Sequence, residues 1–144
     1  MTQLVTRQGF VPETWPETGV IVSFDTLWNG QDLPIERPIG VRLEVDGDPA
    51  DLVPWFDPMS MIVVPFPKSA DGRAFSLARQ LRQLGYSGTI RAEGHVLVDQ
   101  FRAALRVGID EVAISDDQAA RNPEDQWLAV PHFDGYQTRL FAAE

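Results

Sequence analysis

Arginine is the residue type in this chain with the clearest capacity for chemistry. Twelve residues are Lys or Arg, and Lys68 is the only lysine among them. A guanidinium binds carboxylates and oxyanions through two parallel hydrogen bonds, whereas an ammonium acts as a point charge. Between residues 68 and 106 seven cations stand against three acidic residues, a local excess of four positive charges in a chain of net charge -9. This segment predicts anion binding, and the alternative is a solvated helix face with ion pairs.

Two loops, each expected to follow a strand and to precede a helix, concentrate the candidate binding residues. The predicted ligand-binding residues are Lys68, Asp71, Gly72, Arg73, Ser76, Arg79, Arg91, Gly94, Asp99 and Gln100. Ligands of open parallel sheets bind beyond the carboxyl ends of the strands, where helix N-termini supply amide donors. If the two strands are neighbours, the two loops face one common crevice.

Proton transfer has two candidate residues in the second loop. His95 has a side chain that titrates near neutral pH, and Asp99 is a carboxylate close to it in sequence. Each also has a structural interpretation, because a loop histidine is usually only polar and Asp99 can pair with Arg102 along a helix. Arg91 lies inside a short predicted strand, so it needs a partner if buried, either Asp99 or a bound anion.

Composition narrows the remaining function classes. The chain has no cysteine, so it cannot hold a Cys-ligated cluster, and its two histidines have no spaced partner that predicts a metal site. Neither the complete phosphate-binding loop nor the dinucleotide fingerprint occurs, so we expect no cofactor. The net charge of -9 argues against nucleic acid. No apolar run predicts a membrane helix and no export signal is readable, so we expect a cytoplasmic protein.

The hydrophobic pattern predicts a small open α/β domain that positions these loops. Residues 1–144 are expected to form a single domain, with a Pro/Trp-rich lead-in at 1–40, a parallel core at 41–115, and an acidic loop with an extended tail at 116–144. Predicted strands cover 41–45, 61–66, 89–92 and 110–115, with shorter extended pieces at 3–6 and 19–24. Predicted helices cover 73–84 and 96–107, with Leu84 and Leu97 among their buried residues. The expected architecture is three-layered around a mainly parallel β-α-β-α-β sheet, and the alternative is a partial barrel.

Three segments carry a family resemblance. They are Phe66-Pro67-Lys68, the run from Asp71 to Arg79, and the run from Arg91 to Gln100. The chain resembles the bacterial family of unknown function 934, which is encoded beside assimilatory sulfite reductase and carries the label of an oxidoreductase of sulfite reduction. That label comes from gene neighbourhood. The chain departs from the family pattern at Glu93, His95, Val98, Val107 and Ile109.

Three hypotheses for function follow. The first is an accessory protein of assimilatory sulfite reduction that binds a small oxyanion or a protein partner, either sulfite reductase or its electron donor. The second is a small enzyme in which Arg73 and Arg91 clamp an anionic metabolite while His95 or Asp99 moves a proton. The third is a scaffold that forms a homodimer through residues 1–40.

Overall fold

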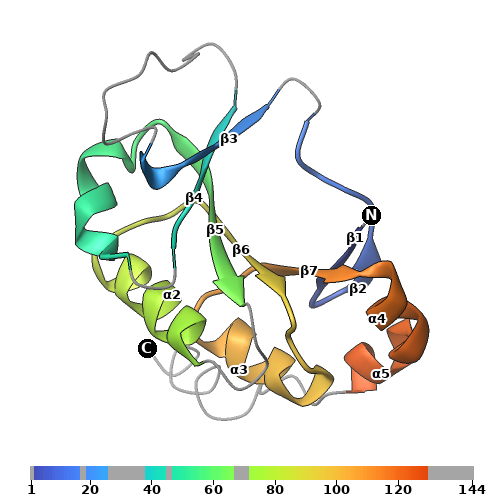
Figure 1. Ribbon diagram of the computed structural model, residues 1–144. Helices are drawn as coiled ribbons and strands as arrows, with labels where there is room; N and C mark the ends of the chain where they lie inside the picture. The colour runs from blue at the N-terminus through green and yellow to red at the C-terminus, as the bar shows by residue number, and fades with distance from the viewer. Residues whose placement is uncertain (1, 17–18, 26–37, 45–46, 67–71, 130–144) are drawn as a thin grey trace, which may run out of the picture.

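A seven-stranded open sheet forms the centre of the molecule (Figure 1). The computed structural model describes residues 2–16, 19–25, 38–44, 47–66 and 72–129. The strands are β1 (Thr2–Thr6), β2 (Gly9–Val11), β3 (Val20–Ser23), β4 (Ile39–Arg42), β5 (Met59–Phe66), β6 (Thr89–Gly94) and β7 (Glu111–Ser115). Their order across the sheet is β2-β1-β7-β6-β5-β4-β3. Strands β3 to β7 are parallel, and β1 runs antiparallel to both β7 and β2.

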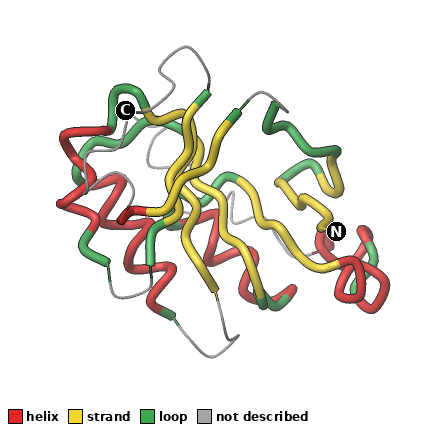
Figure 2. Tube along the Cα trace, turned by 45° about the horizontal axis from the view of Figure 1, so that its top comes forward, coloured by secondary structure: helices red, strands yellow, loops and turns green. Residues whose placement is uncertain are grey.

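The described helices connect or follow these strands. They are η1 (Pro49–Trp55), α2 (Arg73–Gln83), η2 (Val98–Gln100), α3 (Phe101–Arg106), α4 (Asp116–Arg121) and α5 (Glu124–Ala129). Helix α2 connects β5 to β6, and α3 connects β6 to β7, so each crossover joins neighbouring strands. Crossovers of one handedness between successive neighbours place their helices on the same face. Accordingly, α2 and α3 lie on one side of the sheet (Figure 2).

The expected open, mainly parallel α/β architecture with a β-α-β-α-β core is confirmed. Helices α2 and α3 share one face of this core, and the sheet is open. We call the opposite face of the sheet the strap face. It is the face on which the connection from β2 to β3 runs (Figure 1).

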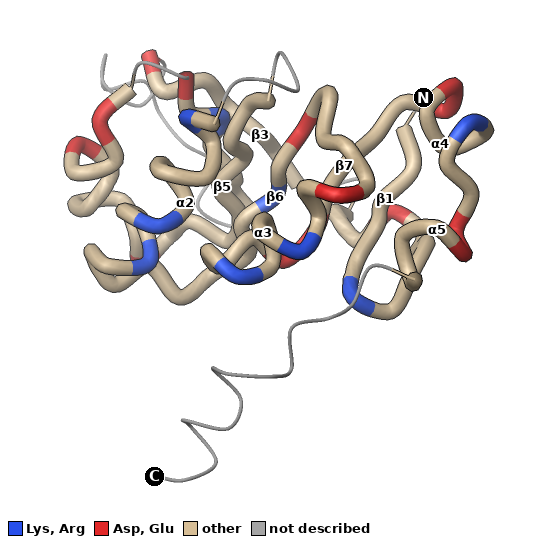
Figure 3. The backbone as a smooth tube through the Cα atoms, turned by 90° about the horizontal axis from the view of Figure 1, so that it is seen from below, with Lys and Arg blue, Asp and Glu red and all other residues tan. Residues whose placement is uncertain are grey.

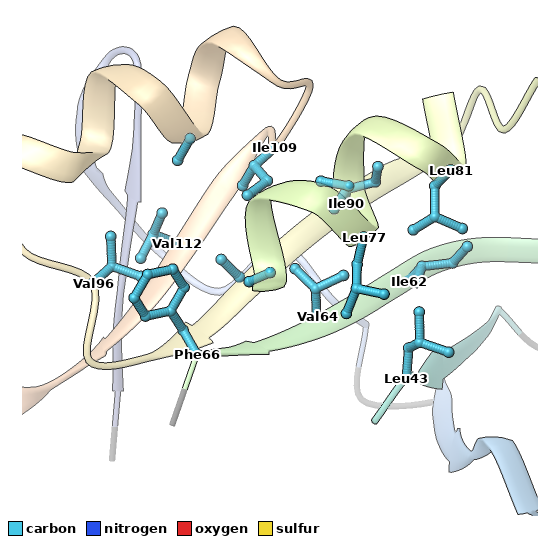
Figure 4. Packing of buried hydrophobic residues seen from close by; sticks show 14 of the residues in the cluster. Leu43, Ile62, Val64, Phe66, Leu77, Leu81, Ile90, Val96, Ile109 and Val112 are labelled. Carbon is cyan, nitrogen blue, oxygen red and sulfur yellow. The ribbon is translucent and has the colours of Figure 1, made fainter. Parts of the chain in front are cut away.

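The hydrophobic core fills the space between the sheet and α2 and α3 (Figure 4). Strand β5 contributes Ile62, Val64 and Phe66, and α2 contributes Leu77 and Leu81, all of them buried. Strand β5 is also buried on its strap face at Met61 and Val63, which explains its continuous apolar sequence.

Several element boundaries differ from the sequence-based predictions. Strand β4 ends at Arg42, before the predicted strand end, and the predicted helix over 96–107 is divided into η2 and α3. Leu84 and Leu97 were expected to be buried, but each is more than 40% exposed. Both lie at a helix boundary, where the 3.6-residue period no longer determines which way a side chain points.

The acidic stretch after β7 is helical, which corrects the prediction of a loop at 116–126. The Ser115 hydroxyl accepts a hydrogen bond from the Gln118 amide and caps α4, whose first turn carries Asp116 and Asp117. Acidic residues in a first turn favour the helix dipole, and Glu124 and Asp125 have the same position in α5. The buried Trp127 of α5 packs edge-on against Phe101 at a centroid distance of 5.4 Å. The predicted extended tail at 130–144 lies outside the described residues.

The connection from β2 to β3 joins the two edge strands of the sheet. Strand β2 ends at Val11 on one edge and β3 begins at Val20 on the other. Eight connecting residues reach at most about 30 Å, and six strand spacings along a flat sheet also come to about 29 Å. We call the described residues 12–16 of this connection the strap.

Arg82 joins α2 to the loops that lead into β6 and β7. Its guanidinium donates to the carbonyl oxygens of Tyr86, Gly88 and Gly108 and to Asp110 Oδ2, at distances of 2.8 to 3.1 Å. Asp110 Oδ2 also accepts from the Ile90 amide. One planar side chain thus satisfies three loop carbonyls that have no strand partner at these positions.

We expect Arg82→Lys to lower the free energy of unfolding by about 1–3 kcal/mol, because an ammonium cannot reach this spread of acceptors. Urea denaturation measures the difference. Arg79→Lys is the matched control, since Arg79 is exposed on the same helix. Equal stability of the two variants would contradict the assigned role of Arg82.

Candidate functional site

A groove on the helix side brings together two of the predicted ligand-binding residues. Arg73, Ser76 and Gln80 follow one another along one face of α2 and line the groove together with Leu77. Its other wall is the turn at 47–49 before η1, and its volume is about 410 Å³. In that turn the Asp48 side chain accepts from the Ala50 amide and caps η1.

The groove offers the donors that an oxygen anion needs. The Arg73 guanidinium, the Ser76 hydroxyl and the Gln80 carboxamide lie on one face of α2, and all three residues are exposed. Asp48 on the opposite wall limits the negative charge that a ligand can bring near it. Arg79, also predicted as a binding residue, is exposed on α2 but does not line the groove.

Helices α2 and α3 carry positive charge only. Every charged residue of α2 and α3 is an arginine, in a chain whose net charge is -9 (Figure 3). Five of the seven cations between residues 68 and 106 thus lie on these two helices of the same face, and α2 lines the groove.

Arg91 lies on the strap face, away from the groove. Its neighbours Ile90 and Ala92 belong to the core under α2 and α3, so alternation along β6 directs Arg91 to the opposite face. It is 5% exposed and stands directly opposite Glu111 of β7 in the strand register. Arg91 Nε donates to Glu111 Oε1 at 2.9 Å.

Glu13 of the strap completes this buried cluster. Its carboxylate receives two hydrogen bonds from Arg91, one of 3.1 Å from Nη1 and one of 2.6 Å from Nη2. The hydrogen bond from Arg91 is the main cause that lowers the pKa of Glu13 below its usual value. Burial acts to lower the pKa of Arg91, but the hydrogen bonds and charges of Glu13 and Glu111 outweigh it and leave that pKa raised. Glu13 and Arg91 are therefore both charged at neutral pH.

The structure does not bring Arg73 and Arg91 together, which corrects the expectation of one crevice clamped by both. Arg73 is exposed on α2 and Arg91 is buried on the other face. Asp99 is also not the partner of Arg91, which pairs with Glu13 and Glu111 instead. Glu111 could have been found from the sequence by aligning the two predicted parallel strands. Glu13 lies 78 residues from Arg91, and no local pattern relates them.

The second predicted loop is organised around Gly94. Its φ of +133° suits glycine, and a Cβ there would overlap the Phe66 carbonyl oxygen at the end of β5. That oxygen accepts from the His95 amide at 2.8 Å, while the His95 residue itself is exposed. Gln100 Oε1 accepts from the Leu97 amide, and Asp99 is exposed in η2. Gly72 is exposed before α2, and Lys68 and Asp71 lie outside the described residues.

The described part of the chain contains neither a metal-binding cluster nor a membrane-spanning helix. No group of three or more His, Cys, Asp or Glu side chains is arranged to hold a metal ion there. None of the helices there is long and apolar enough to span a membrane.

The fold and these sites define the protein as an open-sheet α/β protein. Helices that carry arginines cover one face of its sheet, and an ion cluster centred on the buried Arg91 lies on the other. The sequence profile of the family described as "Bacterial protein of unknown function (DUF934)" matches residues 40–142. The chain therefore belongs to this family, which confirms the resemblance seen in the sequence. No curated protein and no solved structure matches the chain significantly.

The pH dependence of stability tests the pairing of Glu13. The pKa of Glu13 is lower in the folded protein than its reference value of 4.5. Its ionised form therefore adds stability that is complete above about pH 4.5 and is lost as the pH falls through the lower folded-state pKa. We expect Glu13→Gln to be less stable than the unsubstituted protein at pH 7 and the difference to shrink below pH 4.5.

Thermal unfolding between pH 3 and pH 7 measures this difference. Glu44→Gln is the control, because Glu44 is an exposed glutamate at another position. If the Glu13→Gln difference stays constant over the whole range, the ion pair contributes nothing to stability.

Proposed function

We propose that the protein is an accessory protein of assimilatory sulfite reduction that binds an oxygen anion, either a small oxyanion or an acidic group of a protein partner. The proposed partner is sulfite reductase or its electron donor. The observation that carries this proposal is the groove in which Arg73, Ser76 and Gln80 line one face of α2.

The chemistry of the groove supports binding more than catalysis. Its donors match an oxygen anion, and every charged residue of α2, which forms one wall, is an arginine, whereas Asp48 lies on the other wall. The proton-transfer candidate His95 follows β6 and is not among the residues that line the groove. The chain has no thiolate for an iron–sulfur cluster, so any redox step would belong to the partner or to a separate cofactor.

The link to sulfite reduction rests on the family. The gene neighbourhood that the resemblance implies places the family beside assimilatory sulfite reductase. Sulfite and sulfate are oxyanions of the kind that an arginine and a hydroxyl bind. The same donors also suit the carboxylates on a protein surface, so the two forms of the proposal share one site.

Thermal-shift titration with sulfite, sulfate and phosphate tests the small-anion form. A ligand that binds only the folded state raises the apparent melting temperature by mass action. We expect a saturable, anion-selective rise that Arg73→Ala abolishes. Arg79→Ala is the matched control, because it removes the same charge from the same helix outside the groove, and it should leave the rise intact.

Co-purification with sulfite reductase and its electron donor, from cells grown on sulfate, tests the protein-partner form with the same two variants. Association lost in Arg73→Ala and retained in Arg79→Ala supports it. If neither an anion shift nor an association depends on Arg73, the proposed function is wrong.

A further inference from the structure

We propose that the strap face contains a carboxylate-binding site at Arg91, and that Glu13 of the same chain occupies it in this structure. This goes beyond the proposed function, because the site lies on the other face of the sheet and uses none of the groove residues. The ligand class is a small monoanionic carboxylate, which would displace Glu13 and release the strap.

The receptor half of the site is built into the sheet. Arg91 and Glu111 are direct partners on adjacent parallel strands, and their side chains are 6% and 7% exposed. Glu111 Oε1 lies 2.9 Å from both Nε and Nη2 of Arg91, so it holds one edge of the guanidinium. The two outer nitrogens then point at the position where Glu13 sits. A buried guanidinium with a fixed orientation is preorganised to bind a planar carboxylate through both of its oxygens.

Glu13, which occupies the site, belongs to the strap and not to a strand of the sheet. Glu13 is two residues beyond the end of β2, and its side chain is 49% exposed even while it binds Arg91. Its Oε1 also accepts from the Trp15 amide at 2.8 Å, within the strap itself. Loss of Glu13 would leave every strand pairing intact, because the strap takes no part in the sheet.

The charges of the cluster select a monoanion. Glu111 already balances the charge of Arg91. Glu13 therefore accepts hydrogen bonds from the remaining N–H groups of Arg91 but is not needed to neutralise its charge. A dianion such as sulfate would add repulsion from the buried Glu111 carboxylate, whereas a carboxylate reproduces the charge and shape of Glu13. The strap-face site and the groove therefore differ in the anions they favour.

Chemical rescue of Glu13→Ala by acetate and propionate tests this inference. The substitution removes the occupant and leaves the receptor, so we expect a lower melting temperature that either carboxylate raises in a saturable way. The unsubstituted protein should need a concentration of acetate or propionate about tenfold higher, or more, for the same rise in melting temperature than Glu13→Ala needs. Its own Glu13 competes with the added carboxylate for Arg91 through charge-assisted hydrogen bonds. Sodium chloride at matched ionic strength should not reproduce the rise, and Glu44→Ala should not show the lowered midpoint.

The outcomes separate this site from the groove. If Glu13→Ala shows no carboxylate response, or if chloride or Glu44→Ala reproduces it, the strap-face site does not exist. If Arg73→Ala abolishes the response of Glu13→Ala, the carboxylate binds in the groove, and this inference fails while the proposed function stands.

A second measurement uses the unsubstituted protein and does not depend on the stability of a variant. The Trp15 amide donates to Glu13, so its NMR resonance reports the state of the strap. We expect acetate to shift this resonance saturably at high concentration, with chloride having no such effect. An unchanged Trp15 resonance would overturn strap release.

Discussion

The buried guanidinium of Arg91 is the constraint on which the strap face depends. An arginine that is only 5% exposed must have its charge balanced and its donors satisfied inside the protein. Glu111 provides the charge from the neighbouring strand, and Glu13 provides the remaining acceptors from a segment distant in sequence. The cluster therefore ties the N-terminal strap to the parallel sheet. Removal of Arg91 would leave the buried Glu111 without this partner, whereas removal of Glu13 would leave the Arg91–Glu111 pair in place.

This tie fits the path of the chain. Successive parallel strands from β3 to β7 place α2 and α3 on one face, so the other face must be covered or polar. The strap lies over that face, where Glu13 binds Arg91. At the carboxyl ends of the strands, Arg42 and Glu93 form a more exposed ion pair at 3.1 Å on the same face. The two faces then differ in chemistry, with an arginine-lined groove on the helix side and an ion cluster under the strap.

The sequence predicted those parts of the fold that local patterns determine. The apolar run of β5 and the amphipathic α2 were recognisable because burial on both faces or on one face leaves a distinct pattern. Strand β2 and helices α4 and α5 were missed, because each is six residues or shorter and α4 begins with two aspartates that also suit a loop. The rule that ligands bind beyond the carboxyl ends of parallel strands placed Arg73 and Arg91 beside one crevice, because each belongs to a segment at such a strand end. Strand alternation separates them, and the true partner of Arg91, Glu13, is contributed by tertiary structure that no local pattern encodes.

A double-mutant cycle on Glu13 and Arg91 tests the central claim most directly. The free energies of unfolding of Glu13→Ala, Arg91→Met and the double variant, measured in urea, give the coupling between the two side chains without the other contacts of Arg91. The account predicts a favourable coupling of about 1–3 kcal/mol, so that Glu13→Ala costs little once Arg91 is absent. Strictly additive effects of the two substitutions would mean that the strap is held by other contacts, and would contradict the account.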